Sequence, residues 1–169
     1  MIVIRETTTD DIENIYNHLN LNYVKKYCKS DEDEQKKNHE RWYRFLISSS
    51  KYAMFSVEDL KGTFLGNVKF QLDEDFEGAE ISLYLAECIR GKGYSTTIVN
   101  ASIDELRFKY QNLKYVVAYI LEENDRSILC FKKAGFQFKG QIEHGGIDYF
   151  LYMKVFEWWR EFWEKKREL

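Results

Sequence analysis

The chain of 169 residues contains no proline, so turns have to be read from glycine, asparagine, aspartate and serine. It has three cysteines, Cys28, Cys88 and Cys130, without CxxC spacing. An odd, scattered set argues against a disulfide framework or a zinc site and indicates reduced thiols. No signal-peptide pattern opens the sequence, and no apolar run is long enough to span a bilayer. The sequence therefore predicts a cytoplasmic protein that binds neither a metal nor a membrane.

An excess of basic residues is also missing. The formal net charge is -3, whereas a nucleic-acid-binding domain normally carries a positive excess. We therefore expect no nucleic-acid partner. Aromatic residues are abundant at 17%, so the core has to be built largely from phenylalanine, tyrosine and tryptophan. The length is typical of one domain with a substantial core.

Hydrophobic periodicity predicts a mixed α/β (α+β) fold. Alternating apolar and polar residues predict a strand over 1–6, and apolar or aromatic runs between turn residues predict strands over 52–58, 62–73, 78–86, 114–121 and 149–156. Helical spacing and capping residues predict helices over 8–19, 30–49, 95–110, 124–134 and 156–169. This order predicts a mixed, mostly antiparallel sheet covered by helices.

The stretch IRGKGYSTTIV, residues 89–99, has the glycine and lysine content of a phosphate-binding loop that leads into a helix. A Walker loop needs its lysine and hydroxyl after the second glycine, but Lys92 lies between Gly91 and Gly93. A dinucleotide-binding loop needs a third glycine, where this chain has Thr96. Such a loop also follows the first strand of its fold, whereas this one follows the fourth predicted strand. Both alternatives are therefore disfavoured.

A third reading of the loop is the pyrophosphate loop of GCN5-related N-acetyltransferases. Arg90, Gly93 and Ser95 match the motif Q/R-x-x-G-x-G/A, with serine at its last position. A second motif, N-x-x-[AS]-x-x-x-[YF]-x-K-x-G-F, is matched by Asn124, Ser127, Phe131, Lys133, Gly135 and Phe136. The two motifs occur in the family's order with a predicted strand between them. The chain thus resembles the GNAT superfamily over nearly its whole length.

The resemblance implies a GNAT fold, in which the fourth and fifth strands splay apart and helices lie on both faces. It implies a GNAT domain over 1–155, with an aromatic C-terminal helix over 156–169 packed on it. That helix has five large aromatic residues, which cannot all face water comfortably. They pack either on the helix's own domain, in a monomer, or on a second copy, in a homodimer.

The resemblance also implies acetyl-CoA as co-substrate. The backbone near Leu83 and Leu85 would pair with the pantetheine arm, and the loop after it would hold the pyrophosphate. The expected cofactor-binding residues are Leu83, Leu85, Arg90, Gly91, Lys92, Gly93, Tyr94, Ser95, Asn124, Ser127, Phe131 and Lys133.

Transfer to an amine requires a base near the thioester, because an ammonium cannot attack a carbonyl. Glu80 is the first candidate, since period two places it on one face of its strand with Ser82 and Tyr84. Glu122 and Glu123 are weaker candidates. Many relatives have a tyrosine that protonates the leaving thiolate at the position of Phe131, which cannot do so. Tyr84 and Tyr119 are substitutes by position.

The acceptor is less defined by the sequence. The segment KKNHERWYRFL is similar to one in GNAT enzymes that acetylate amino sugars on nucleotide carriers or the N-termini of ribosomal proteins, through His39 and Trp42. We expect transfer to a primary amine of a small molecule, for instance an amino sugar or a nucleotide-linked amino sugar. A protein N-terminal acetyltransferase and a non-catalytic acyl-CoA-binding module are the alternatives.

Overall fold

The computed structural model describes residues 1–27 and 36–156, and within them seven strands form one sheet in the order β1-β2-β3-β4-β5-β7-β6. Only β4 and β5 pair in parallel, and the other neighbours are antiparallel. The predicted mixed, mostly antiparallel sheet is therefore confirmed. The strands are β1 (Ile2–Glu6), β2 (Tyr52–Asp59), β3 (Phe64–Leu72), β4 (Gly78–Leu85), β5 (Tyr115–Ile120), β6 (Gln137–His144) and β7 (Ile147–Val155).

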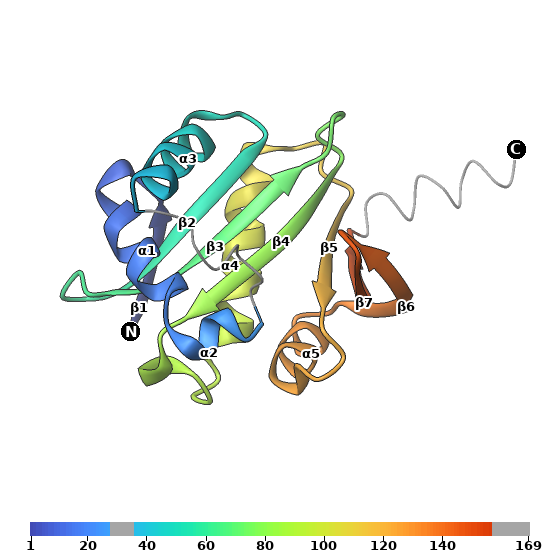
Figure 1. Cartoon of the computed structure of the whole chain (residues 1–169). Coiled ribbons are helices and arrows are strands. Elements are labelled where there is room, and N and C mark those ends of the chain that lie inside the picture. The colour runs from blue at the N-terminus through green and yellow to red at the C-terminus, as the bar shows by residue number, and fades with distance from the viewer. Residues whose placement is uncertain (28–35, 157–169) are drawn as a thin grey trace, which may run out of the picture.

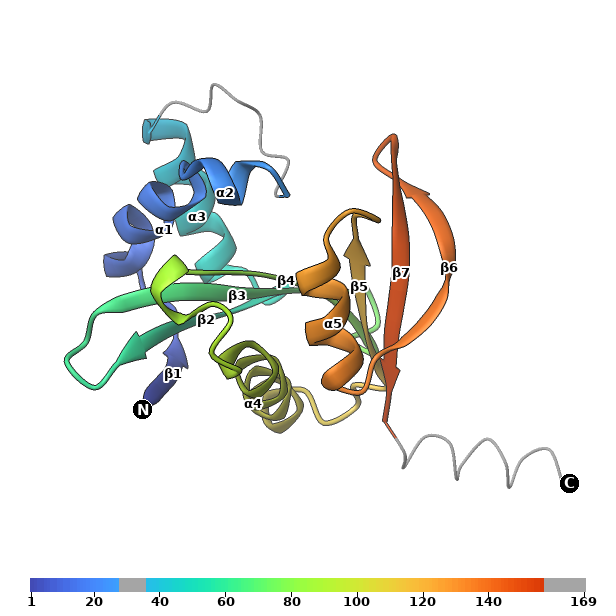
Figure 2. The same cartoon turned by 90° about the horizontal axis from the view of Figure 1, so that it is seen from below.

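Helices cover both faces of the sheet. Figure 2 shows α1, α2 and α3 on one side of it and α4 and α5 on the other. Two short 3-10 turns, η1 and η2, precede α1 and α4. The bounds are η1 (Thr9–Asp11), α1 (Ile12–Leu19), α2 (Asn22–Lys25), α3 (Lys36–Ser48), η2 (Glu87–Ile89), α4 (Tyr94–Lys109) and α5 (Asp125–Lys133).

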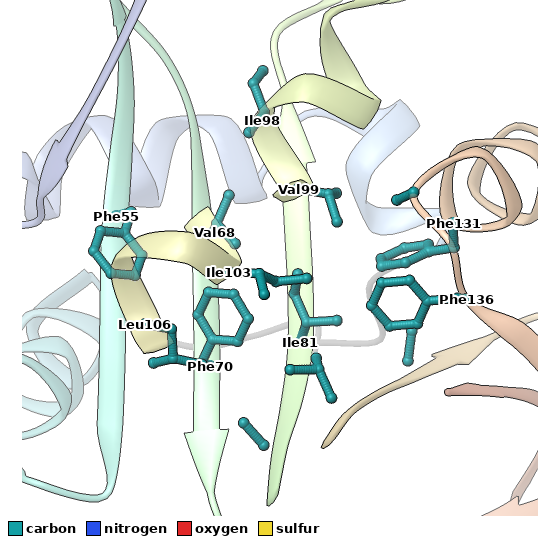
Figure 3. Close-up of a cluster of buried hydrophobic side chains, with 14 of the residues drawn as sticks. Phe55, Val68, Phe70, Ile81, Ile98, Val99, Ile103, Leu106, Phe131 and Phe136 are labelled. Carbon is teal, nitrogen blue, oxygen red and sulfur yellow. The ribbon is translucent and has the colours of Figure 1, made fainter. Parts of the chain in front are cut away.

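The main core lies between the sheet and α4 (Figure 3). Alternate strand residues point to this side, as the two-residue period requires, and the side chains of α4 meet them at helical spacing. Phe131 of α5 lies edge-on to Phe136, with their ring centroids 4.9 Å apart, and extends the core toward β5. The other core residues labelled in Figure 3 are Phe55, Val68, Phe70, Ile81, Ile98, Val99, Ile103 and Leu106.

A smaller apolar cluster fills the other face, between α1, α3 and the first strands. It contains Ile12, Ile15, Tyr43, Leu46, Met54 and Phe64. The residues of β4 and β5 that point to this face are only partly buried or exposed: Glu80, Ser82, Tyr84, Val117 and Tyr119. We call this part of the sheet the open face.

A buried polar network fixes the start of the chain against β2 and β3. Arg5 donates hydrogen bonds of 2.8 Å to both oxygens of Asp11 and also pairs with Glu58. The Ser56 hydroxyl donates to Asp11 over 3.0 Å. Burial alone would raise the pKa of Asp11, but the hydrogen bonds from Arg5, from the Thr8 amide and from Ser56 outweigh it and lower that pKa. Asp11 is thus held as a carboxylate.

The six predicted strands and the helices at 8–19, 95–110 and 124–134 are confirmed to within a few residues. Strand β6 was not predicted, because its register with β7 shifts between Phe138 and Gly140 and nearly all of its residues are exposed. The first residues of the helix predicted over 30–49 lie outside the described residues. So does the predicted C-terminal helix, apart from Phe156, which is buried beneath the Arg107 guanidinium.

Candidate active site

Strands β4 and β5 separate partway along their length, and Figure 1 shows them diverging toward the end of the sheet where α2 and α5 lie. They pair only over Gly78–Glu80 and Tyr115–Val117. Within the described chain, the rest of β4, up to Leu85, pairs with β3 on its other side. Its edge toward β5 therefore presents N–H and C=O groups that an extended ligand can bind as an added strand. Leu83 and Leu85, which were predicted to bind the donor, lie on this stretch.

The glycine loop follows η2 and leads into α4. Gly91 and Gly93 have left-handed backbone angles, with φ of 74° and 81°, and Gly93 is the N-cap of α4. No atom lies within 4 Å of a Cβ built at either position, so the backbone conformation, not crowding, requires glycine. The first N–H groups of this 16-residue helix have no intrahelical partners and carry partial positive charge. With Lys92 exposed beside them, they can hold a phosphate.

Arg90 enters this loop with its side chain packed on α2. The guanidinium carbon lies 3.9 Å from the ring centroid of Tyr23. Arg90 Nε is buried, and none of the described residues accepts a hydrogen bond from it. A buried donor without a partner is rare in folded proteins. Arg90 is therefore packed against Tyr23, and its Nε donor lies unsatisfied beside the loop within the described residues.

Glu80 lies at the vertex of the β4–β5 split, since it is the last residue of β4 that pairs with β5. Its side chain is 35% exposed and points to the open face. Its Oε2 atom lies 3.8 Å from Nε2 of His144, at the end of β6. The weaker candidates Glu122 and Glu123 are exposed in the turn after β5.

Tyr119 of β5 contributes an aromatic ring beside Glu80. It stacks on the His144 ring, with centroids 4.3 Å apart and the planes only 2° from parallel. Tyr149 of β7 lies edge-on to Tyr119, with centroids 6.1 Å apart. Burial and then the negative charge of Glu80 raise the pKa of Tyr119, so its hydroxyl stays protonated at neutral pH.

Tyr84 lies on the same face, two strand positions further along β4 than Ser82. Its ring packs beside His18 of α1, with centroids 6.1 Å apart, and its hydroxyl is buried. His18 in turn lies edge-on to Phe64. The open face of the split is thus bordered by α1 on the β4 side and by the β6–β7 hairpin on the β5 side.

The residues of the second motif lie on α5, at the other side of the split. Asn124 is the N-cap of α5, and its side-chain oxygen accepts a hydrogen bond of 3.3 Å from the Ser127 amide. Phe131 is buried in the core, while Lys133 is exposed in the last turn. The structure therefore brings Asn124 and Ser127 to the helix start and places Phe131 inside the protein.

The two residues predicted to bind the acceptor occupy different environments on α3. His39 is only 3% exposed and stacks on Tyr43, with centroids 4.2 Å apart, so it packs between α3 and α1. Trp42 is 46% exposed and stacks on Phe45. Of this pair, only Trp42 presents a ring to solvent.

Four residues of the site were not singled out from the sequence: His18, Tyr23, His144 and Tyr149. The pair Gly145-Gly146 is a hairpin-turn signal that would place His144 at a turn. Its contact with Glu80 depends on how the hairpin packs across the sheet, which no local pattern reports.

Among the described residues, no group of histidine, cysteine, aspartate and glutamate side chains is arranged to hold a metal ion. No helix in residues 1–27 and 36–156 has the length and apolar character needed to cross a membrane.

Comparison with known proteins gives both sequence and structural relatives. Residues 2–137 match the family model described as the acetyltransferase (GNAT) domain. The spermidine N(1)-acetyltransferase of Vibrio cholerae is 23% identical over 142 residues, which are 83% of this chain and 82% of that protein. The L-methionine sulfoximine/L-methionine sulfone acetyltransferase of Pseudomonas aeruginosa is 29% identical over 113 residues, or 64% of each chain.

Solved structures share the fold. The aminoglycoside acetyltransferase AAC(6')-Ib in complex with coenzyme A has a TM-score of 0.81 at 18% identity, covering 95% of this chain and 98% of that one. The spermidine N-acetyltransferase of Vibrio cholerae in complex with CoA and spermine has a TM-score of 0.80 at 22% identity, covering 91% and 95%.

Proposed function

Because the chain belongs to the GNAT acetyltransferase family and so takes its acetyl group from acetyl-CoA, we propose that it transfers this group to a primary amine of a small polar molecule. The observation that carries the proposal is the carboxylate of Glu80 at the vertex of the β4–β5 split, on the open face of the sheet. It lies where the unpaired edge of β4 begins, on the same strand as the expected position of the thioester near Leu85.

The residues around the split fit the donor. The unpaired edge of β4 suits the pantetheine arm, and the α4 N-terminus with Gly91 and Gly93 suits the pyrophosphate. Arg90 offers a buried donor beside this loop. In this proposal, the amide near Leu85 polarises the thioester carbonyl, and acetyl-CoA supplies an acetyl carbon activated by a thiol leaving group.

Glu80 acts as the general base in this proposal. Its carboxylate accepts a proton from the acceptor's ammonium, which leaves a neutral amine with a free electron pair. The amine nitrogen bonds to the acetyl carbon while the carbon–sulfur bond breaks. The products are the N-acetylated amine and the coenzyme A thiol, and one proton is released.

Solvent is the simplest proton source for the leaving thiolate. Phe131 is buried and has no acidic proton, and the raised pKa of Tyr119 makes it a weak acid. A thiol has a pKa of about 8.5, so the thiolate leaves readily without a strong acid beside it. The role of Tyr119 in this proposal is to border the acceptor and to position His144. Tyr84 lies on the same face, but its buried hydroxyl does not reach the thiolate in this proposal.

The aromatic character of the open face supports a small acceptor. Tyr119 and His144 lie beside Glu80, and Tyr149 contacts both rings. Tyr84 packs with His18 further along β4 on the same face. Aromatic faces and a carboxylate together attract a compact cation. Polyamines and amino sugars, including nucleotide-linked ones, are the first classes to test, since named relatives act on spermidine and aminoglycosides. Protein N-termini are the alternative class of acceptor.

A panel of amines tests the proposal. The purified protein is incubated with acetyl-CoA and, separately, with spermidine, aminoglycosides, amino sugars, nucleotide-linked amino sugars, amino-acid analogues and N-terminal peptides, and free thiol is measured. We expect turnover with at least one small amine and none with peptides. Binding of acetyl-CoA without turnover on any amine would instead support a non-catalytic acyl-CoA-binding module. Turnover restricted to peptides would support an N-terminal acetyltransferase.

A further inference from the structure

His144 is held at the tip of the β6–β7 hairpin by a tight turn. It pairs in register with Ile147, so Gly145 and Gly146 alone form the loop between the strands. Both glycines have left-handed backbone angles, with φ of 60° and 76°, as a two-residue type I′ turn requires. The turn therefore fixes where the backbone of His144 lies.

Two tyrosines fix the plane of the His144 ring. Tyr119 stacks flat against it, with centroids 4.3 Å apart, and Tyr149 meets it edge-on, with centroids 6.4 Å apart. Offset-stacked and edge-on contacts of this kind restrict the rotation of an aromatic ring. The ring is half-exposed, so the tyrosines orient it without burying it.

The oriented ring points its Nε2 atom at Glu80. The two side chains come from strands that are not neighbours in the sheet, since β5 and β7 lie between β4 and β6. Their atoms Nε2 and Oε2 are nevertheless 3.8 Å apart, which is within the reach of an ion pair but longer than a hydrogen bond. Without a neighbouring side chain, a glutamate that is 35% exposed on a strand samples several rotamers. Restricting it to the one rotamer that the reaction needs then costs conformational entropy.

We propose that His144 is a positioning residue for the base of the acetyl transfer, and that it acts by holding the Glu80 carboxylate at the vertex of the β4–β5 split. The inference rests on the proposed function, because it assigns Glu80 the role of base. His144 itself touches neither the acceptor nor acetyl-CoA in this account. Its removal leaves Glu80 in place but less often in the reactive orientation, so the loss falls on kcat.

A double-mutant cycle tests this inference with the amine that the panel identifies. We expect His144→Ala to lower kcat about tenfold, since small misplacements of catalytic groups cost up to a hundredfold. The KM for acetyl-CoA stays unchanged. In a Glu80→Gln background, His144→Ala has no further effect, because there is no base left to position. If the activity of Glu80→Gln is too low to measure, Glu80→Asp serves instead, since its shorter side chain withdraws the carboxylate from His144.

Two further variants separate positioning from a general effect on the hairpin. His144→Gln retains an amide donor near the position of Nε2, and we expect it to restore most of kcat. Glu143→Ala, which changes the neighbouring exposed residue, leaves kcat at the wild-type value. An unchanged kcat in His144→Ala would overturn the inference. So would a loss of kcat from His144→Ala that is as large in the Glu80 variant as in the wild type. A wild-type protein that acetylates no amine would instead overturn the proposed function.

Discussion

The ring of Tyr115 lies directly over the backbone of Gly78, its partner in the first pair of β4 and β5. A Cβ atom at Gly78 would lie 2.3 Å from Cζ of Tyr115, far inside van der Waals contact. The Tyr115 hydroxyl also donates a hydrogen bond of 3.3 Å to Asp73. This close approach holds β4 and β5 together at the first of their paired residues, before the two strands separate.

We therefore expect Gly78→Ala to lower the free energy of unfolding by about 2 to 3 kcal/mol, because overpacking displaces either the ring or the strand. Urea denaturation measures the change. In a Tyr115→Ala background the added methyl group has room, so the same substitution should cost much less. An equal cost in both backgrounds would show that the ring is not the reason for glycine here.

Gly93 offers a test of the donor site with a matched control. Gly93 and Gly62 have nearly the same left-handed φ, 81° and 80°, and both have open space where a Cβ would be. Alanine at either position strains the backbone by about 1 kcal/mol. Only Gly93→Ala disturbs the N-terminus of α4, so we expect it to raise the Kd for acetyl-CoA about tenfold or more by titration calorimetry. Gly62→Ala should leave that Kd unchanged, and a similar rise in both variants would contradict the assignment of the loop.

Tyr23 links α2 to the same loop through Arg90. A cation–π contact contributes about 0.5 to 2 kcal/mol, depending on how far it is removed from water. Tyr23→Leu should therefore weaken acetyl-CoA binding about three- to tenfold, because Arg90 is no longer held toward the loop. Tyr23→Phe keeps the ring and should bind with nearly the wild-type Kd. The prediction fails if Tyr23→Leu binds acetyl-CoA as tightly as Tyr23→Phe.

Asp11 gives the stability a defined dependence on pH. Its pKa is lower in the folded protein than in the unfolded chain, since hydrogen bonds from Arg5, Thr8 and Ser56 outweigh the effect of burial. The ionised carboxylate therefore stabilises the fold fully above about pH 4, and this stabilisation declines as the pH falls toward the lower folded pKa.

We expect Asp11→Asn to be about 2 kcal/mol less stable than the wild type at pH 7, a modest value because Arg5 reaches solvent. The difference should shrink below pH 4. Urea denaturation between pH 3 and 7 measures it, with the exposed substitution Asp148→Asn as control. A gap that stays constant, or widens, on acidification would contradict the role of the carboxylate.

Local sequence patterns were sufficient for most of the fold. The apolar runs that form β2, β3 and β4 and the cap at Asn124 depend on neighbouring residues, and the structure confirms these strands and the cap. Strand β6 was not predicted, because its bulge and its exposed residues interrupt the alternation of apolar and polar side chains.

The candidate site could be predicted only in part, because some of its residues form one continuous motif and others are far apart in the sequence. The glycine loop is one continuous motif and can be read directly. The contact of Glu80 with His144 joins residues 64 positions apart across two other strands. The burial of His39 likewise depends on which side of α3 meets α1, since Trp42, less than one helical turn away, is exposed.

The most direct test of the account is the mass of an amine after incubation with acetyl-CoA and either the wild-type protein or Glu80→Gln. We expect the wild type to add one acetyl group to at least one small amine of the panel. Glu80→Gln should transfer the acetyl group at a rate at least about a hundredfold lower, since a general base contributes that factor or more. The variant should still bind acetyl-CoA with the wild-type Kd. The absence of any acetylated small amine, or equal rates for the two proteins, would contradict the account.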